Sequence, residues 1–285
     1  RGWKHNYGAP CKKNQGVPKF IKMKKFLVIG NPIEHSLSPK LHNYWINENN
    51  INALYEKHKL DEKDLKNLIF QVKEKKIDGI NVTVPFKRAV IPFLDQLTNE
   101  AVKTQSVNTI YLNENKLTGH NTDIIGFEKS IKNFKYNLNN KEIFILGAGG
   151  VVPSIIFALT QMGVSKIIVS NRTKKKADNL KKLFQNIEIL DWGKIPNFDM
   201  IINATSIGLK KEDYINLDFS SVGKGKFFYD VIYNPDETNF LKIGKNAGNI
   251  TLNGKMMFIY QALSAFTIWH GVEPKINEDV IKLLD

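Results

Sequence analysis

The sequence contains one cysteine, Cys11, in 285 residues, so no disulfide bond can form within the chain. Such low cysteine usage is typical of a reducing compartment, and we expect a cytoplasmic protein. No stretch approaches the roughly 18 consecutive apolar residues of a membrane-spanning helix. No group of His, Cys, Asp and Glu residues has the spacing of a metal site. We therefore expect neither a membrane partner nor a metal.

Acidic residues are missing from the start of the chain, and their absence accounts for much of the net charge of +13. Eight Lys and Arg residues precede the first acid, Glu34, which leaves about +5 of that charge for everything that follows. Basic tracts are usually solvated surface, so we expect no nucleic-acid partner. The modest positive field of the remaining chain suits an anionic substrate and a cofactor phosphate.

Residues 1–22 also lack an apolar period, and they are rich in Gly, Pro and Asn. They contain neither the apolar core nor the small-residue cleavage site of a secretory signal. We interpret this segment as a disordered extension or an expression remnant, and we leave it out of the predicted fold.

Hydrophobic periodicity in the first third of the chain alternates between strands and helices. Strands and helices are predicted in turn at residues 26–30, 38–49, 53–59, 61–76 and 79–84. This β-α-β-α-β order predicts a mainly parallel sheet covered by helices. Ser38 is predicted to cap the helix that it opens, with Pro39 at the first helical position. Another helix is expected from Lys87, and a hairpin is expected between residues 106–112 and 116–121.

A second alternation follows Asp123 and has the pattern of a doubly wound sheet. Strands are predicted at residues 142–146, 166–170, 187–190, 200–203 and 226–231. Helices are predicted at residues 124–134, from the glycine loop to about 162, and at 174–184, 255–269 and 276–284. We expect an α/β fold of two domains, of which the second is a Rossmann-type nucleotide-binding domain.

The strand at 142–146 runs into Gly147-Ala148-Gly149-Gly150 and then into a helix. Glycines let the backbone approach a pyrophosphate, and a helix N-terminus supplies free N–H groups and a positive dipole. The strand–loop–helix context favours a dinucleotide site over an ordinary tight turn. Val152 stands in the place of the third glycine of that fingerprint, so the packing of helix on strand is expected to differ there.

The next strand lacks the acid that usually accepts a hydrogen bond from the NAD ribose. It ends at Ser170, and the residues that follow are Asn171-Arg172-Thr173 and Lys174-Lys175-Lys176. A guanidinium can pair with a 2′-phosphate, and positive charge at a helix N-terminus is unfavourable unless an anion neutralises it. We therefore predict NADP rather than NAD, and we interpret Lys175 as ordinary solvated surface.

Three polar clusters fall at predicted strand ends or turns of the first half, where ligands bind in open α/β sheets. They are His35-Ser36-Leu37-Ser38-Pro39, Asn81-Val82-Thr83-Val84-Pro85-Phe86-Lys87 and Asn121-Thr122-Asp123. Ser36 and Ser38 can each donate a hydroxyl to a carboxylate, and Asn81 and Thr83 share one face of their strand. Each cluster alone is weak evidence, because a serine can simply cap a helix and a histidine such as His35 is more often structural or at the surface.

These motifs stand in a specific order, together with Val-Asn-Thr (107–109), Gly-His-Asn-Thr-Asp (119–123), Asn-Ala-Thr-Ser (203–206) and a late Gln261. In combination they resemble the shikimate dehydrogenase family, over nearly the whole chain from about Phe26. The resemblance implies reversible reduction of 3-dehydroshikimate to shikimate with NADPH, in the pathway to chorismate and aromatic amino acids.

The same resemblance implies a site in the cleft between the two domains. Residues 23–122 and 254–285 would form the substrate-binding domain, and residues 123–253 the NADP-binding domain. The partners are then small molecules only, and the protein is expected to be a monomer or a homodimer.

Roles carry over from the family position by position. The implied substrate-binding residues are Ser36 and Ser38 for the carboxylate, Thr83, Asn108, Asp123 and Gln261 for the ring hydroxyls, Asn81 beside them, and Tyr233 nearby. The implied cofactor-binding residues are Gly147, Ala148, Gly149, Gly150, Val151, Asn171, Arg172, Thr173, Lys176, Thr205, Val231 and Gly254.

Lys87 and Asp123 are the implied catalytic pair. Hydride transfer to a ketone carbon leaves negative charge on the oxygen, which the ammonium of Lys87 can stabilise and then protonate. In the oxidative direction Lys87 acts as the base. A neighbouring carboxylate favours the charged lysine, so we assign Asp123 to orienting Lys87 and to binding a hydroxyl.

Two stretches depart from the family pattern. Val151, Val152 and Pro153 follow the glycine loop where the family has small and basic residues, and Met256 stands in the place of a glycine. Both changes concern cofactor affinity more than substrate identity. Two alternatives stay open: a quinate/shikimate dehydrogenase with relaxed substrate or cofactor choice, and a non-catalytic dinucleotide-binding protein.

Overall fold

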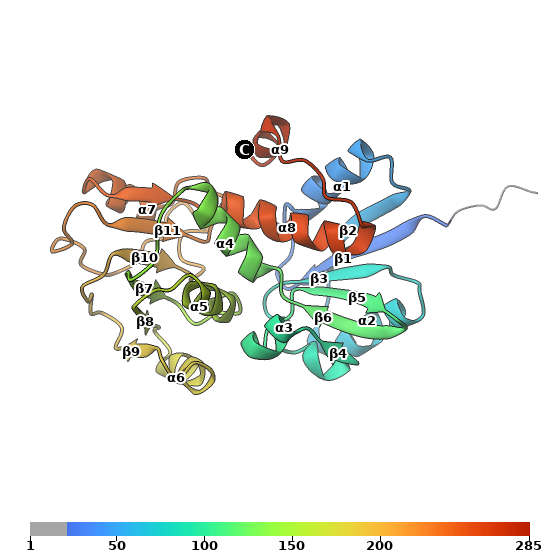
Figure 1. Ribbon diagram of the computed structural model, residues 1–285, viewed down its shortest axis with the longest axis horizontal. Coiled ribbons are helices and arrows are strands. Elements are labelled where there is room, and N and C mark those ends of the chain that lie inside the picture. Colours follow the sequence, from blue (N-terminus) through green and yellow to red (C-terminus); the bar gives the residue numbers. More distant parts are fainter. Residues whose placement is uncertain (1–21) are drawn as a thin grey trace, which may run out of the picture.

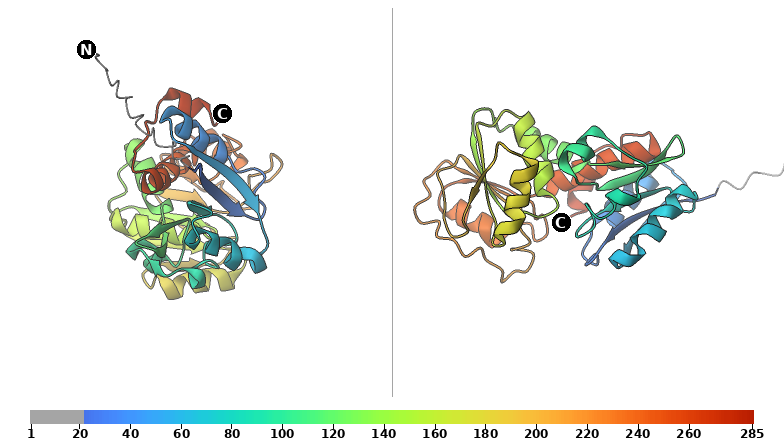
Figure 2. Two further views of the ribbon diagram at one scale, coloured as in Figure 1. Left: turned by 90° about the vertical axis from the view of Figure 1, so that its right-hand side faces the viewer. Right: turned by 90° about the horizontal axis from the view of Figure 1, so that it is seen from below.

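The computed structural model describes residues 22–285, which form two α/β domains (Figure 1). Cys11 and all of the expected extension 1–22 except Lys22 lie outside the described residues. The two domains lie side by side, and a long helix near the C-terminus runs between them (Figure 2). Within the described range no helix is long and apolar enough to cross a membrane.

The first domain is built on a six-stranded mixed sheet with the strand order β2-β1-β3-β5-β6-β4. Its strands are β1 (Lys24–Gly30), β2 (Ala53–Lys59), β3 (Gly79–Val82), β4 (Gln96–Leu97), β5 (Thr109–Asn113) and β6 (Lys116–His120). Strand β1 runs parallel to both β2 and β3, while β5 is antiparallel to β3 and β6. The helical segments are α1 (Ser38–Glu48), η1 (Glu62–Asp64), α2 (Leu65–Lys73), η2 (Ile91–Phe93) and α3 (Asn99–Thr104). The expected mainly parallel beginning and the expected hairpin are both present.

The second domain is a parallel six-stranded sheet with the order β12-β11-β10-β7-β8-β9. Its strands are β7 (Glu142–Leu146), β8 (Lys166–Ser170), β9 (Glu188–Leu190), β10 (Met200–Asn203), β11 (Phe227–Asp230) and β12 (Ile250–Leu252). The helices are α4 (Asp123–Asn133), α5 (Val152–Gln161), α6 (Lys174–Leu183) and α7 (Asn239–Asn246). The strand order reverses between β7 and β10, and this switch point is where open α/β sheets bind ligands.

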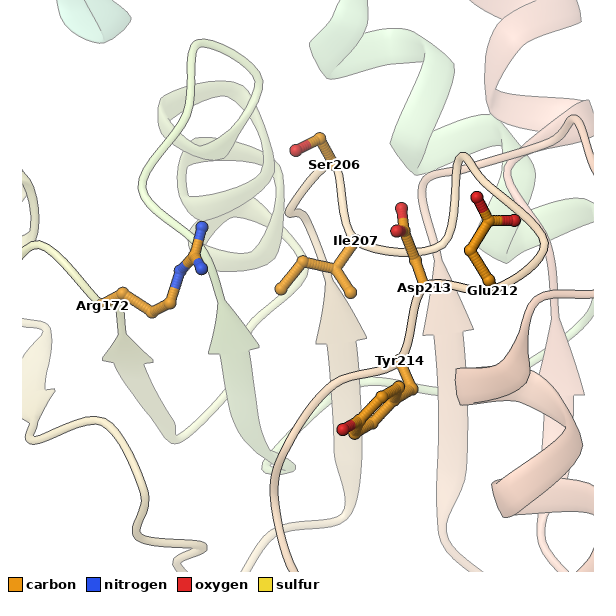
Figure 3. A pocket seen from close by; sticks show the side chains of 6 residues that line it. All are labelled: Arg172, Ser206, Ile207, Glu212, Asp213 and Tyr214. Atoms are coloured by element: carbon orange, nitrogen blue, oxygen red, sulfur yellow. The ribbon is translucent and has the colours of Figure 1, made fainter.

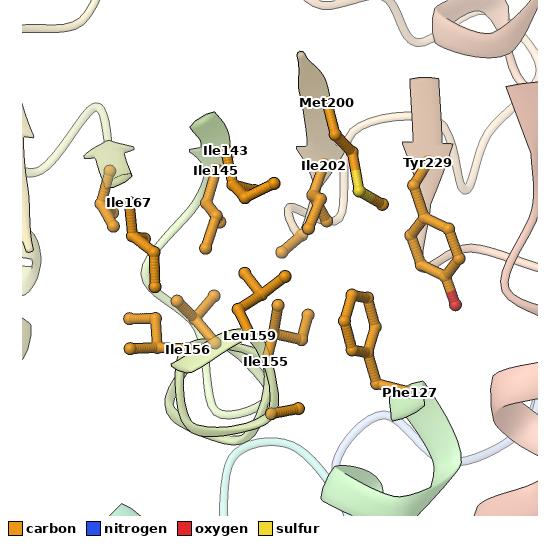
Figure 4. Packing of buried hydrophobic residues seen from close by; sticks show 14 of the residues in the cluster. Phe127, Ile143, Ile145, Ile155, Ile156, Leu159, Ile167, Met200, Ile202 and Tyr229 are labelled. Carbon is orange, nitrogen blue, oxygen red and sulfur yellow. The ribbon is translucent and has the colours of Figure 1, made fainter. Parts of the chain in front are cut away.

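The strands of the second sheet read as continuous apolar runs because both of their faces are covered. On one face Ile155, Ile156 and Leu159 of α5 pack against the isoleucines of β7, β8 and β10 (Figure 4). On the other face Phe144 and Phe228 pack within a second buried cluster that includes helix α7. This two-sided burial fixes the ends of β7 and β10, from which the loops at the switch point depart.

Helices α4 and α8 (Lys255–His270) carry the chain between the two domains (Figure 1). Met257 near the start of α8 belongs to the core of the second domain, whereas Ile259 and Phe266 belong to the core beneath β1, α1 and β2. Helix α9 (Glu278–Lys282) joins that same core through Val280. The two crossing helices touch closely at Gly126, where a Cβ atom would lie 2.8 Å from the carbonyl oxygen of Met257.

Two local predictions in the first domain were wrong. Ser38 is the first residue of α1 and does not cap it, because Leu37 holds the N-cap position and Pro39 follows within the first turn. No α-helix starts at Lys87. Turns follow it at residues 87–90, and Pro92, within the short 3-10 segment η2, has no N–H to donate to an α-helical hydrogen bond. Helices α3 and α7 and strands β4 and β12 were not predicted, because all four are short.

Candidate active site

Lys87 and Asp123 form an ion pair at the boundary of the two domains, with 2.5 Å between Lys87 Nζ and Asp123 Oδ2. Their side chains are only 12% and 8% exposed. Lys87 follows the turn after β3, and its carbonyl oxygen accepts a hydrogen bond from the backbone N–H of Val107 at 2.8 Å. Asp123 is the first residue of α4. A paired lysine in this sheltered position is held in a single place, as a group that delivers a proton must be.

Asn108 holds the other side of the Asp123 carboxylate. Its Nδ2 donates to Asp123 Oδ1 at 3.1 Å and to the Thr122 hydroxyl at 2.8 Å. Its Oδ1 accepts from the backbone N–H of Thr122 at 2.8 Å. The Oε1 atom of Gln261, on α8, lies 3.5 Å from the same Nδ2. Both carboxylate oxygens of Asp123 are therefore engaged, one by an amide and one by the ammonium.

Ser36 and Ser38, predicted for the carboxylate, lie at the entry to α1. Asn81 and Thr83, predicted near the ring hydroxyls, lie on and just after strand β3. The Ser36 hydroxyl accepts a hydrogen bond from the backbone N–H of Ser38 at 3.3 Å, so Ser36, and not Ser38, contacts a free N–H of the helix start. Asn81 is buried at the middle of the sheet. Thr83 continues from β3, with its backbone N–H bonded to Ile29 at 2.9 Å. His35, by contrast, is exposed.

Tyr233 comes from the second domain and reaches the serine loop of the first. Its ring stacks on Phe258 of α8, with 4.3 Å between the ring centroids. Burial raises the pKa of Tyr233 to about 12, against an opposing hydrogen bond to the backbone of Leu37. Leu37 lies between Ser36 and Ser38, so Tyr233 closes one wall around the predicted carboxylate position.

The glycine loop passes between the two strand ends at the switch point. Gly147 has a φ of +113°, and a Cβ atom there would lie 2.7 Å from the carbonyl oxygen of Ala204, so only glycine fits. Ala148, Gly149 and Val151 lie on the partly exposed loop that follows. Helix α5 begins at Val152, which stands in the place of the third glycine of the fingerprint and is fully buried in the core of the second domain.

The segment after β8 is shaped by Asn171, whose Nδ2 donates to the carbonyl oxygen of Thr173 at 2.8 Å. Arg172 lines a cavity of about 370 Å³, together with Ser206, Ile207, Glu212, Asp213 and Tyr214 (Figure 3). Lys176 is exposed at the start of α6. The cavity joins the segment after β8 to the loop after β10, at the place where the sequence predicts the adenosine end of the cofactor.

The loop after β10 is tied down by Asn203, whose Oδ1 accepts from the Thr205 hydroxyl at 2.7 Å and from its N–H at 3.1 Å. The Nδ2 of Asn203 in turn donates to both oxygens of Asp230, at 3.1 Å each. Burial raises the pKa of Asp230 to about 6. Val231 follows, and its carbonyl oxygen would lie 2.1 Å from a Cβ atom on Gly254. The two predicted nicotinamide positions are thus in contact.

Two family models match the chain in succession. Residues 28–110 match the shikimate dehydrogenase substrate binding domain, and residues 128–226 match shikimate / quinate 5-dehydrogenase. A Pelagibacter ubique (strain HTCC1062) protein named shikimate dehydrogenase (NADP(+)) is 60% identical over 262 residues, which cover 92% of this chain and 99% of that one. The chain belongs to the shikimate dehydrogenase family. The resemblance inferred from the motifs is confirmed.

Solved structures of shikimate dehydrogenases share the two-domain fold. The enzyme from Aquifex aeolicus is 37% identical, with a TM-score of 0.84 over 92% of this chain and 97% of that one. The enzyme from Thermus thermophilus, solved in complex with NADP(H) and shikimate, is 29% identical, with a TM-score of 0.83 over 92% and 98% of the two chains. The fold class expected from the sequence is therefore confirmed.

Some residues at this shikimate dehydrogenase site were missed by the sequence reasoning. Tyr55 contacts two predicted substrate residues, Ser106 contacts the glycine loop, and Tyr214 lines the cavity beside Arg172. Tyr55 carried no sequence signal, because only the structure shows that it is the single buried side chain of strand β2. Ser106 and Tyr214 stand in no motif that the sequence reasoning used. Among the described residues, no group of three or more His, Cys, Asp and Glu could hold a metal ion.

Proposed function

We propose that this chain catalyses the reversible NADPH-dependent reduction of 3-dehydroshikimate to shikimate, in the pathway to chorismate and aromatic amino acids. The observation that carries the proposal is the position of the Lys87–Asp123 pair. The side chain of Lys87 passes 3.6 Å from where a Cβ atom on Gly150 would stand, so an acid–base group meets the predicted cofactor loop. The NADP-dependent name of the Pelagibacter relative supports the same reaction.

The residues of the second domain fit NADP. Gly149 and Gly150 carry no side chain, which leaves the loop backbone accessible to a pyrophosphate. The cavity at Arg172 offers a guanidinium to a 2′-phosphate. When bound there, NADPH supplies the hydride. The residues proposed to hold it are Gly147, Ala148, Gly149, Gly150, Val151, Asn171, Arg172, Thr173, Lys176, Thr205, Val231 and Gly254.

The residues of the first domain bind and orient the substrate in this proposal. Ser36 and Ser38 donate their hydroxyls to the carboxylate, with Tyr233 beside them. The ring hydroxyls are bound by Thr83, Asn108, Asp123 and Gln261, with Asn81 alongside. Lys87 stabilises the developing alkoxide and gives it a proton, and in the oxidative direction it removes that proton. Asp123 keeps the ammonium pointing at the reacting oxygen.

We assign the two binding functions to separate domains. Residues 23–122 and 254–285 bind the substrate, and residues 123–253 bind NADP. Support comes from the buried clusters, since most of α8 packs with β1 and α1, whereas α4 packs with the second sheet. We further propose that the protein acts in the cytoplasm on these small molecules, as a monomer or a homodimer. A sequence with one cysteine agrees with that setting.

The test is the absorbance of NADPH at its own band after the purified chain is mixed with shikimate and NADP⁺. We expect the band to rise, and to fall in the reverse direction with 3-dehydroshikimate and NADPH. The same assay with quinate and with NAD⁺ separates the relaxed-specificity alternative. Turnover with NAD⁺ equal to or better than with NADP⁺ would show that Arg172 has been assigned wrongly.

The non-catalytic alternative predicts a different pair of results. A folded chain that binds NADPH, followed by calorimetry, but gives no absorbance change with shikimate would be a binding module. Retention of the full set Lys87, Asp123, Ser36 and Ser38 favours the enzyme.

A further inference from the structure

Tyr55 is a buried tyrosine of strand β2 whose hydroxyl lies among the predicted substrate residues. Its side chain is 1% exposed. The hydroxyl donates to Asn81 Oδ1 at 2.7 Å, and the Ser38 side chain is its second hydrogen-bonding partner. Tyr55 therefore stands behind two groups that the proposed function uses, one from the start of α1 and one from β3.

The position of the hydroxyl is fixed from two directions. The backbone of Tyr55 is held by one side chain, since Asn43 Oδ1 accepts from the Tyr55 N–H at 2.9 Å and Asn43 Nδ2 donates to the Tyr55 carbonyl at 2.8 Å. The ring is stacked on His42, with 4.2 Å between the centroids and an interplanar angle of 4°. A side chain clamped at both ends presents its hydroxyl at one point.

The hydroxyl also satisfies the oxygen end of the Asn81 amide, whose orientation is set by the carbonyl oxygen of Asn108. The Nδ2 of Asn81 donates to the carbonyl oxygen of Asn108 at 3.0 Å and to the Thr109 hydroxyl at 3.1 Å. The Oδ1 of Asn81 is left for a donor, which Tyr55 supplies. Without that donor a buried carbonyl oxygen would lose its partner, and the amide would be held only at its Nδ2 end.

The network continues from Asn81 to the proposed catalytic pair. The Thr109 hydroxyl donates to Asn108 Oδ1 at 3.0 Å, and Asn108 Nδ2 reaches Asp123 Oδ1 at 3.1 Å. Asp123 then pairs with Lys87. Members of this network are buried, so each contact is made in a low dielectric and leaves little freedom for its neighbours. One set of hydrogen bonds joins Ser38, at the carboxylate end, to Lys87 at the reacting end.

We propose that Tyr55 is a positioning residue of the active site, which sets the Ser38 hydroxyl and the Asn81 amide at the spacing from Lys87–Asp123 that shikimate requires. The inference rests on the proposed function and adds a residue to it. Tyr55 touches neither the reacting atoms nor the cofactor loop, so its loss weakens substrate binding and leaves cofactor binding as it was.

The experiment is Tyr55→Phe, which keeps the ring stack on His42 and removes only the hydroxyl. A neutral hydrogen bond is worth about 1 kcal/mol, which corresponds to roughly a fivefold change. We therefore expect KM for shikimate to rise about fivefold and KM for NADP⁺ to stay within a factor of two. Tyr44→Phe is the matched control, because Tyr44 packs against the same apolar cluster and its hydroxyl has no hydrogen-bond partner in the described part of the chain. It should change neither constant.

A double-mutant cycle separates positioning from general stability. If Tyr55 acts through Asn81, adding Tyr55→Phe to Asn81→Ala should raise KM for shikimate by less than it does in the wild-type background. Equal effects in both backgrounds, or an unchanged KM in Tyr55→Phe, would overturn the positioning role. So would parallel rises in both KM values together with a lower Tm.

Calorimetry with shikimate keeps this inference distinct from the proposed function. A wild-type chain that binds shikimate without turning it over overturns the function alone. A Tyr55→Phe chain that binds shikimate as tightly as the wild type overturns the positioning role alone. A wild-type chain that does not bind shikimate overturns both.

Discussion

The Ser106 hydroxyl donates a hydrogen bond to the carbonyl oxygen of Gly150 at 3.0 Å. Ser106 is buried in the first domain and Gly150 belongs to the glycine loop of the second, so this bond crosses the domain boundary. A second bond does the same, since Asn121 Nδ2 donates to the Ser154 hydroxyl of α5 at 2.9 Å. The glycine loop is thereby fixed against Lys87, whose side chain lies beside Gly150.

Removing the Ser106 hydroxyl should weaken NADPH binding. In Ser106→Ala the Gly150 carbonyl loses its partner, and a loss of about 1 kcal/mol raises KM for NADPH roughly fivefold. KM for shikimate should stay unchanged, because the substrate residues do not contact this bond. Ser165→Ala, which removes an exposed hydroxyl bonded to the carbonyls of Asn140 and Lys141, is the control. An unchanged KM for NADPH would contradict the prediction.

Lys87→Ala should abolish most turnover and leave substrate affinity nearly intact. Loss of a general acid–base group lowers kcat by about 10² to 10⁴-fold. The dissociation constant of shikimate, measured by calorimetry, should change little because other residues bind the carboxylate and hydroxyls. Lys66→Ala, an exposed lysine on α2, should behave as wild type. A Lys87→Ala chain with near-normal kcat would rule out the proton-transfer role.

Arg172→Ala should reduce the preference for NADP over NAD. A hydrogen bond to a charged group contributes about 1.5–3 kcal/mol, so the ratio of kcat/KM for NADP⁺ over NAD⁺ should fall by roughly 10 to 100-fold. KM for shikimate should not move. Lys175→Ala provides the comparison, since we interpret Lys175 as solvated surface at the start of α6. A ratio that drops equally in both variants would assign the effect to general positive charge.

His42 should make the fold sensitive to mild acid. Both ring nitrogens are buried without a hydrogen-bond partner in the described part of the chain. Burial is the larger cause and the charge of nearby His270 the smaller cause that together lower the pKa of His42 to about 3. As pH falls below the unfolded value of 6.5, the unfolded chain takes up a proton that the folded chain refuses. Stability is therefore lost between pH 6.5 and about 3, with about 2 kcal/mol gone by pH 5 from one such histidine.

Urea unfolding of the wild type and His42→Leu at about pH 7.5 and about pH 5 measures this contribution. Asp230 has the opposite effect on stability. Its raised pKa of about 6 lets the folded chain bind a proton at a higher pH than the unfolded chain does, so lowering the pH stabilises the fold through this group. His270, with its pKa lowered by burial to about 4, adds to the loss. Both groups are present in the two proteins, so the difference between them isolates His42. Identical pH dependence in the two proteins would contradict the prediction.

The sequence predicted the order of the long elements and the family, since long apolar periods and motifs of fixed spacing are local signals. Strands β7 to β11 of the second sheet, the glycine loop and the hairpin lie where they were expected, whereas β12 was not predicted. The predicted N-cap of α1 was wrong, because the sequence pattern of a serine before a proline is the same whether the serine caps the helix or is its first residue. The prediction of a helix after Lys87 was wrong because the apolar period there is short and Pro92 follows within it.

Site residues were predictable only where they stand in motifs. The proposed roles of Lys87, Asp123 and Asn108 stay predictions, although the structure brings the three together. Tyr55 could not be found from the sequence, because its partners come from a helix start and a strand that are 17 and 26 residues away in the chain. Contacts of this kind depend on the register of parallel strands, which one sequence does not reveal.

The close packing of α4 on α8 at Gly126 has a mechanical consequence. Asp123 is the first residue of one crossing helix and Gly254 caps the other, so both connections between the domains leave from the proposed site. A rigid rotation moves each atom in proportion to its distance from the axis. Any rotation of one domain relative to the other about these helices would move Arg172 much farther than the carboxylate of Asp123. The proposed catalytic pair would then stay in place while the adenosine end of the proposed cofactor site moves.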